Sequence, residues 1–139
     1  MKAKELMIGD WVKSLKEDHS GEYGQVIDID HHDTVLLKYQ CVNYYTDVEH
    51  IEPIPITPEI LTANGFEKKE NHSGCHYANY IDHSPVYAEQ TIGDQWEIDI
   101  YKNGKIEMCV RYVHELQHIL RLQGLTDFAD QFKVKGGQS

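Results

Sequence analysis

The segment that most restricts the fold is a pair of alternating runs joined by an Asn-Gly step. Trp96–Tyr101 alternates apolar and polar residues, and Ile106–Val110 returns with strand composition. Such alternation is typical of a strand with one buried face. Asn103-Gly104 is the pair that two-residue type I′ turns favour, because both turn positions need positive φ. The sequence therefore predicts an antiparallel β-hairpin.

A helix is predicted directly after this hairpin, over residues 112–123. Its apolar residues recur at helical spacing and share one face: Val113, Leu116, Ile119 and Leu120. Gly124 is placed to end the helix in the left-handed conformation. Covering the apolar stripe contributes about 1.5–3 kcal/mol per side chain, which is sufficient reason for such a helix to exist.

A second, shorter helix is predicted over residues 58–64. Thr57 is a good N-cap, Pro58 suits the first helical position, and Gly65 suits the C-terminal cap. Together with strands between residues 66 and 90 and the later hairpin, the two helices predict an α+β unit over residues 57–139.

Residues 1–56 predict a different architecture. After an opening segment at Leu6–Val12, short strand-like runs follow one another closely, at residues 23–29, 34–39, 41–45 and 51–54. A single turn is expected at Asp47–His50. Many short strands in so little chain are typical of a small antiparallel barrel, and their order resembles an SH3-like barrel.

The net charge of the chain limits the classes of partner that it can bind. The formal net charge is -10, and both predicted domains are acidic. Nucleic-acid binding by phosphate neutralisation needs the opposite sign, so direct binding of nucleic acid is disfavoured. No apolar run reaches the ~20 residues of a membrane span, and no signal peptide is evident. We therefore expect a cytoplasmic protein with a protein partner and three reduced cysteines.

The one recognisable chemical motif is His114-Glu115-Leu116-Gln117-His118. On a helix, this His-Glu-x-x-His pattern places two imidazoles one turn apart and a carboxylate beside them, as zinc hydrolases require. The alternative prediction is accordingly a zinc ion on His114 and His118, with Glu115 as the general base.

Two observations favour a structural interpretation of the motif instead. Only 21 residues follow His118, and none of the usual third-ligand patterns occurs among them. A helical wheel places both histidines with Arg121 on the face opposite the apolar stripe, where a fixed positive charge opposes a metal ion. We therefore predict no metal, no cofactor and no catalytic residue.

Other candidate residues lie outside this motif. Four tyrosines of the predicted barrel form the candidate binding patch: Tyr23, Tyr39, Tyr44 and Tyr45. Tyrosines also cap small cores with their hydroxyls in water, so both interpretations stay open. Two histidine groups have ligand chemistry without the spacing of a standard structural site: His31 with His32, and His72, Cys75, His76 and His83.

Three segments in combination resemble a known group: Ile8–Val12, residues 51–66 and residues 112–118. The chain resembles uncharacterised small proteins of gut Bacteroides genomes, their phages and mobile elements. That group has no established activity, so the resemblance assigns no role to any residue here. The stretch 67–91 matches nothing familiar.

The leading prediction is thus a non-enzymatic binding or adaptor protein of a phage or mobile element. A zinc-dependent hydrolase is the first alternative. A nucleotide-signal sponge or an acidic decoy of a nucleic-acid-binding protein is the next. The chain has no Gly-rich loop of the kind that cradles phosphates, which weakens the nucleotide alternative.

Overall fold

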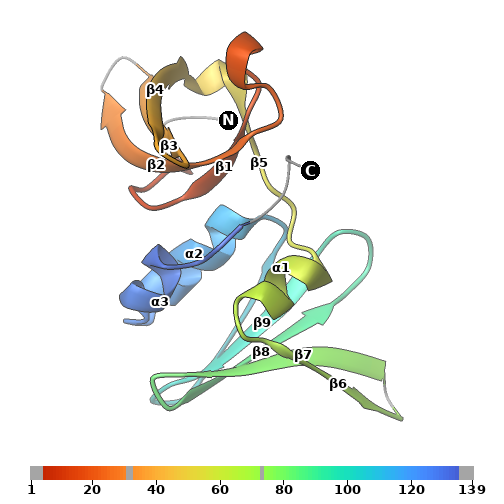
Figure 1. Ribbon diagram of the computed structural model, residues 1–139. Helices are drawn as coiled ribbons and strands as arrows, with labels where there is room; N and C mark the ends of the chain where they lie inside the picture. The colour runs from red at the N-terminus through yellow and green to blue at the C-terminus, as the bar shows by residue number, and fades with distance from the viewer. Residues whose placement is uncertain (1–4, 31–32, 73, 135–139) are drawn as a thin grey trace. The chain divides into compact units, whose positions relative to one another are not determined.

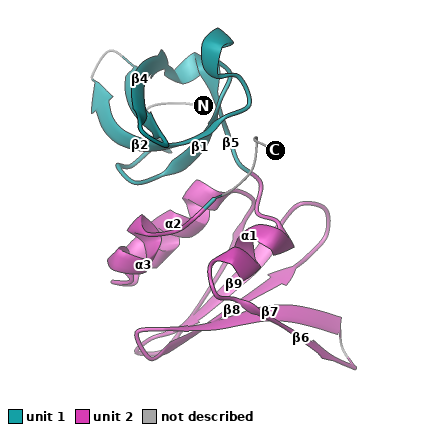
Figure 2. Ribbon diagram, in the orientation of Figure 1, with its two compact units in different colours: residues 1–54, 134–139 teal, residues 55–133 magenta. Residues whose placement is uncertain are grey.

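The computed structural model describes residues 5–30, 33–72 and 74–134 (Figure 1). The chain divides into two compact units, namely Met1–Ile54 with Val134–Ser139 (unit 1) and Pro55–Lys133 (unit 2), as Figure 2 shows. Each unit contains one five-stranded antiparallel sheet, and the helices belong to unit 2. The α+β class is therefore as predicted. The division after Ile54 lies two residues before the predicted one, which followed residue 56, and Val134 belongs to unit 1 although it was predicted in the second domain.

Unit 1 is a meander whose last strand returns to its first. Its elements are β1 (Trp11–Ser14), the 3-10 turn η2 (Glu17–His19), β2 (Tyr23–Asp30), β3 (Thr34–Tyr39), β4 (Val42–Asp47), the 3-10 turn η3 (Val48–His50) and β5 (Ile51–Pro53). The strand order in the sheet is β4-β3-β2-β1-β5. β4 and β5 are the two edges, so among the described residues hydrogen bonds do not close the sheet into a barrel.

The sheet of unit 1 curls around its own core (Figure 1). A bulge in β2 between Val26 and Asp28 shifts the register against β3, and such bulges increase bending and twist. Apolar side chains fill the concave side: Leu6, Val12, Val26, Val35, Leu37, Tyr44, Val48 and Ile51. This burial holds the short strands together, because a sheet of this size is stable only with one covered face.

Unit 2 contains the longer sheet and all three α-helices of the described residues. Its elements are α1 (Pro58–Ala63), β6 (Glu67–Asn71), β7 (Gly74–Ile81), β8 (Ser84–Gln90), β9 (Trp96–Tyr101), β10 (Lys105–Val110), α2 (Val113–Leu122) and α3 (Thr126–Asp130). The strands lie in the order β10-β9-β8-β7-β6. No helix among the described residues has the length and apolar character that crossing a membrane requires.

Each end of helices α1 and α2 lies within one residue of its predicted position. The Thr57 hydroxyl accepts a hydrogen bond from the Ile60 N–H at 3.2 Å, which caps the start of α1. Both helices end in a Schellman motif around a glycine with positive φ, at Gly65 and Gly124. In α2, for example, the Leu125 N–H donates to the Leu120 carbonyl at 2.8 Å.

Polar side chains connect the helices of unit 2 to the chain around them. The Gln117 amide, which is fully buried, donates to the Ala129 carbonyl at 2.9 Å and so joins α2 to α3. Asn64 exchanges hydrogen bonds with the backbone of Lys133. The buried Trp96 indole donates to the Ile56 carbonyl at 3.2 Å. The bonds of Gln117 and Trp96 satisfy polar groups that burial would otherwise leave unpaired, whereas the bonds between Asn64 and Lys133 are exposed.

The predicted hairpin is present, but its turn is one residue longer than predicted. Tyr101 pairs with Lys105, so the loop has three residues, and Asn103 and Gly104 both have positive φ. A two-residue turn would have placed Tyr101 opposite Ile106. Because side chains alternate between the faces of a strand, this one-residue shift decides which face each β10 side chain occupies.

Candidate functional site

The two motif histidines lie close together on α2, but not on a solvated face as predicted. The His114 side chain is buried at 5% exposure, and its ring stacks on Tyr112. The His114 and His118 ring centroids are 5.5 Å apart and nearly perpendicular. The wheel argument was wrong about His114 because it treated α2 as a helix with one buried face. The structure buries Gln117 fully and His114 almost fully as well.

Glu115 has a structural partner at the start of α2. Its Oε1 accepts hydrogen bonds from the backbone N–H groups of Arg111 and Tyr112, at 3.0 and 3.1 Å. This carboxylate therefore satisfies N–H groups that the first turn of a helix leaves open. The Arg121 Nε bonds to Asp130 at 3.0 Å. In the part of the chain that the structure describes, neither His114 nor His118 belongs to a cluster of three ligand side chains.

The other histidine candidates add no third ligand. Within the described residues, His72, Cys75, His76 and His83 do not form a metal-ligand cluster. His31 and His32 lie outside the described residues. The three cysteines are free and exposed, so they are not core residues.

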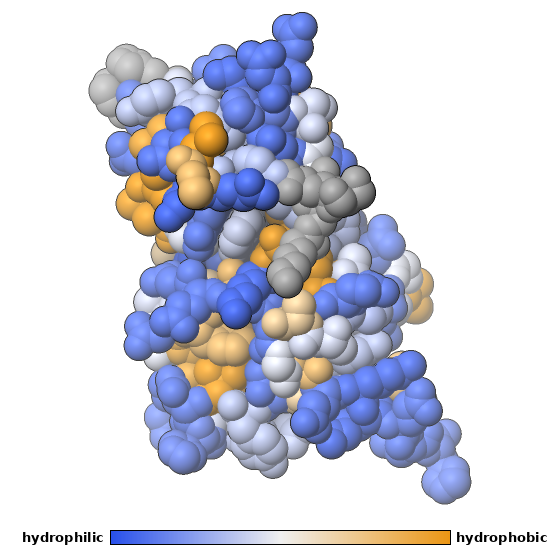
Figure 3. Space-filling view, in the orientation of Figure 1, coloured by the Kyte–Doolittle hydropathy of each residue, from blue (hydrophilic) through white to orange (hydrophobic). Residues whose placement is uncertain are grey.

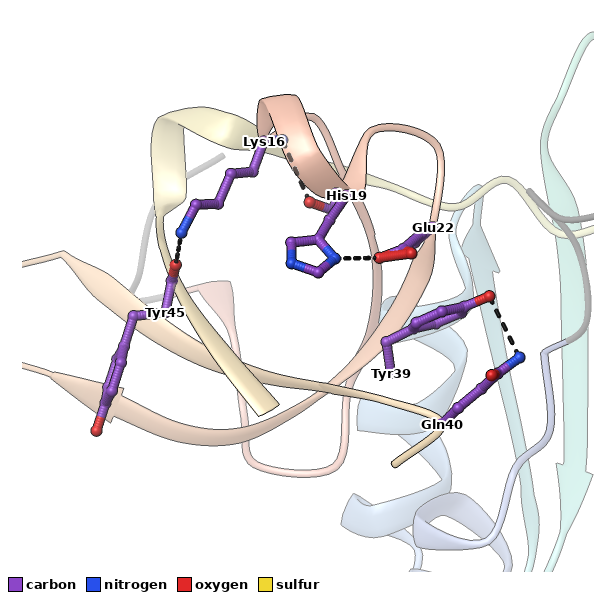
Figure 4. Close-up of polar contacts among 7 residues, drawn as sticks. Lys16, His19, Glu22, Tyr39, Gln40 and Tyr45 are labelled. Atoms are coloured by element: carbon purple, nitrogen blue, oxygen red, sulfur yellow. Dashed lines mark hydrogen bonds and ion pairs between the residues drawn. The ribbon is translucent and has the colours of Figure 1, made fainter. Parts of the chain in front are cut away.

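The four tyrosines of unit 1 do not form one patch, contrary to one of the two interpretations. Tyr44 is buried, at 8% exposure, and its ring stacks on the His19 ring with 3.7 Å between the ring centroids. Burial raises the pKa of the Tyr44 hydroxyl. Tyr39 is half-buried and accepts a hydrogen bond from the Gln40 amide. Tyr45 is 58% exposed, and its ring points away from His19 (Figure 4). Adjacent residues of a strand face opposite sides, so Tyr44 and Tyr45 cannot share a surface.

A cavity of about 670 Å³ lies beside Tyr45, within unit 1. Its walls come from the loop and turn after β1, the start of β3, the end of β4 and η3. The lining residues are Leu15, Lys16, Glu17, Asp18, Thr34, Tyr45, Thr46, Asp47 and His50. We call this cavity the β4 groove, because β4 is the edge strand that borders it.

Two polar contacts mark the wall of the β4 groove. The Lys16 ammonium donates to the Tyr45 carbonyl at 2.7 Å (Figure 4). The same ammonium lies 5.8 Å from the centroid of the Tyr44 ring. Thr46 is only 5% exposed, and among the described residues its hydroxyl has no hydrogen-bond partner. A buried hydroxyl without a partner is unfavourable by about 1–3 kcal/mol, so this group is a candidate for a ligand contact.

A smaller cavity of about 230 Å³ adjoins the β4 groove through Asp47. Asp33 and Glu49 also line it. Negative charge thus continues from one cavity into the next.

A second group of carboxylates lies on the outer face of the sheet of unit 2. Glu97, Asp99 and Glu107 offer oxygens within 4.8 Å of one another, and this is the one group with metal-ligand spacing in the described residues. Asp99 stands opposite Glu107, and Glu97 opposite Glu89. A hydrogen bond with Glu107 raises the pKa of Glu97 to about 7.

Sequence reasoning missed both acidic sites for identifiable reasons. Glu17 and Asp18 belong to no sequence motif, and only the fold brings them to the same cavity as Asp47. The carboxylates of unit 2 depend on the hairpin register: with the predicted two-residue turn, Glu107 would have paired with Ile100 on the buried face. A three-residue turn was the signal that would have placed it beside Asp99.

Comparison of the chain with protein-family models, with curated proteins and with solved structures finds no match.

Proposed function

We propose that the chain is a non-enzymatic binding protein, and that unit 1 is an SH3-like barrel that binds an extended segment of a protein partner in the β4 groove. The strand order β4-β3-β2-β1-β5 and the 3-10 turn between β4 and β5 support the SH3-like assignment. A phage or mobile-element origin and a cytoplasmic location stay predictions from the sequence.

The observation that carries this proposal is a cavity bordered by an open edge strand. An edge strand presents unpaired N–H and C=O groups to a further strand, and partners use such edges for recognition. Apolar side chains stand exposed beside it, notably Leu15, Val42 and Tyr45. A partner strand would therefore gain both backbone hydrogen bonds and apolar contacts.

The motif on α2 supports hydrolysis less well. A general base must be within reach of a reacting water, whereas the Glu115 carboxylate holds two backbone N–H groups at the helix start. Its contacts make it a capping residue, and His114 is a buried neighbour of Tyr112.

Photo-crosslinking tests the proposal. p-Benzoylphenylalanine replaces Tyr45 in one full-length variant and Tyr80, which is 71% exposed in β7, in the other. Both are expressed in cells that carry the gene. We expect a covalent protein adduct from position 45 and none from position 80. Adducts from position 80 alone, or from neither position, would contradict the proposed site.

A further inference from the structure

The β4 groove has an excess of negative charge on its walls. Glu17, Asp18 and Asp47 contribute carboxylates, and Lys16 contributes the one permanent positive charge. His50 lies 3.9 Å from Asp47 and adds charge only when protonated. An occupant that carries positive charge would thus be attracted here, whereas an acidic one would be repelled.

Lys16 of the chain itself shows that an ammonium group can bind to the wall of the β4 groove. Its ammonium reaches across to β4 and donates to the backbone carbonyl of Tyr45 at 2.7 Å. The ring of Tyr44 lies at a cation–π distance of 5.8 Å on the same side. An intramolecular ammonium is thus already held at the free edge of β4.

The Thr46 hydroxyl is an independent sign of a missing partner. It is buried in the wall of the β4 groove and has no hydrogen bond among the residues that the structure describes. A hydroxyl oxygen can accept from an ammonium or a guanidinium, which offer donors and no acceptors. The same hydroxyl can donate to a carboxylate, so Thr46 marks the place of a polar ligand atom, and the negative charge of the walls selects a cation there.

We propose that the β4 groove binds a lysine or arginine side chain of an extended partner segment. This inference rests on the proposed function, because it names the chemistry of the segment that the groove receives. The cation sits between the carboxylates of Asp47 and Glu17 or Asp18 and donates to Thr46, while the backbone of the segment runs along β4.

The test measures the fluorescence anisotropy of three labelled octapeptides with the full chain at about 50 mM salt, where surface charges are little screened. The peptides alternate threonine with lysine, glutamine or glutamate. We expect the lysine peptide to bind about tenfold more tightly than the glutamine peptide, and the glutamate peptide to bind least.

Three variants separate the β4 groove from general charge attraction. Asp47→Asn removes a groove carboxylate, and Thr46→Val removes the hydroxyl without changing charge. Asp94→Asn removes the same charge at an exposed site of unit 2. We expect each of the first two to weaken the lysine peptide by up to about fivefold, since Asp47→Asn removes one exposed ion pair and Thr46→Val one hydrogen bond. The third should leave binding unchanged.

Each contrary result has a distinct meaning. Equal binding of the lysine and glutamine peptides would overturn the cationic inference. If Tyr45→Ala weakened both equally, the groove would still bind a segment and the proposed function would stand. Equal effects of Asp47→Asn and Asp94→Asn, or no binding of any peptide, would also overturn the inference. Crosslinking from position 45 then decides separately whether the groove receives a partner.

Discussion

The two sheets differ most at their free edges. β6, an edge of the sheet in unit 2, is exposed at all five residues and consists of charged side chains and one asparagine. Lys68 pairs with Glu70 at 3.1 Å and Lys69 with Glu67 at 3.0 Å. Figure 3 shows hydrophilic side chains over this end of the sheet. Such charges keep an edge from pairing with another chain.

β4, an edge of the sheet in unit 1, lacks this protection. It exposes Val42 and Tyr45, and one lysine from another loop bonds to its backbone. Charges thus protect the β6 edge from pairing with another chain, whereas the β4 edge stays open beside a cavity. We infer that only the β4 edge pairs with a partner. This contrast is the physical basis for assigning binding to unit 1.

The largest expected effect comes from removing the protection of β6. We predict that a chain with Glu67→Thr, Lys68→Val, Lys69→Thr and Glu70→Val associates through this edge. Light scattering after size-exclusion chromatography would show a larger mean mass than the unmodified chain at equal concentration. A control that exchanges the signs, with Glu67→Lys and Lys69→Glu, keeps the charges and should not associate. Identical masses for all three chains would contradict the protective role of the charges.

The next effect comes from giving β4 the protection that β6 has. Tyr45→Lys places a charge on the exposed side of β4 and adds repulsion toward a cationic segment. We expect the lysine peptide to bind at least about tenfold more weakly. Tyr80→Lys makes the same change on an exposed strand of unit 2 and should have little effect. Unchanged anisotropy titrations for Tyr45→Lys would show that β4 is not the binding edge.

The two edges also show what the sequence could predict. Local signals were sufficient where one short stretch decides the structure. Thr57, Pro58 and Gly65 fixed the bounds of α1 to within one residue, and the five strands of unit 1 follow from their composition. The charged run at β6 lies in the segment where strands were predicted, but its charges were not recognised as those of an edge strand.

The candidate site depends on contacts that no local signal contains. Glu17 and Thr46 meet in the β4 groove only because η2 and β4 come together in the fold. Likewise, burial of His114 follows from tertiary packing rather than from helical periodicity. The register between β9 and β10 depends on the length of the hairpin loop. The third loop residue shifts this register by one position and so places Glu107 on the outer face.

A smaller effect is expected at the Thr46 hydroxyl in the absence of ligand. Thr46→Val replaces an unpaired buried hydroxyl with a methyl group of similar volume, so we predict that unfolding in urea becomes less favourable by about 1 kcal/mol. Thr34→Val is the matched control, because the Thr34 hydroxyl has a contact with Asp47 at 3.5 Å. A loss of stability in Thr46→Val would mean that the hydroxyl has a partner in the free protein.

The smallest effect concerns the carboxylates that unit 2 carries on a sheet face rather than at an edge. The hydrogen bond with Glu107 raises the pKa of Glu97 to about 7 from its usual 4.5, and burial raises the pKa of Asp99 in the same direction. The folded state therefore holds this proton more tightly than the unfolded state. Its contribution to stability is full below about pH 4.5 and is lost as pH rises through about 7. Glu89 adds repulsion, and Lys105 partly offsets it.

Glu97→Gln keeps a neutral hydrogen-bonding group at this position at every pH. We predict that it raises the melting temperature at pH 8 by about 2 °C and changes it less at pH 5, because the native carboxyl is still protonated there. Glu70→Gln removes a carboxylate from the protected edge β6 and serves as the control without such a pH difference. An equal shift at both pH values would mean that general repulsion among the carboxylates, and not a shared proton, governs this face. In that case the carboxylates of unit 2 would affect stability only through their negative charge, as those of the β4 groove affect binding.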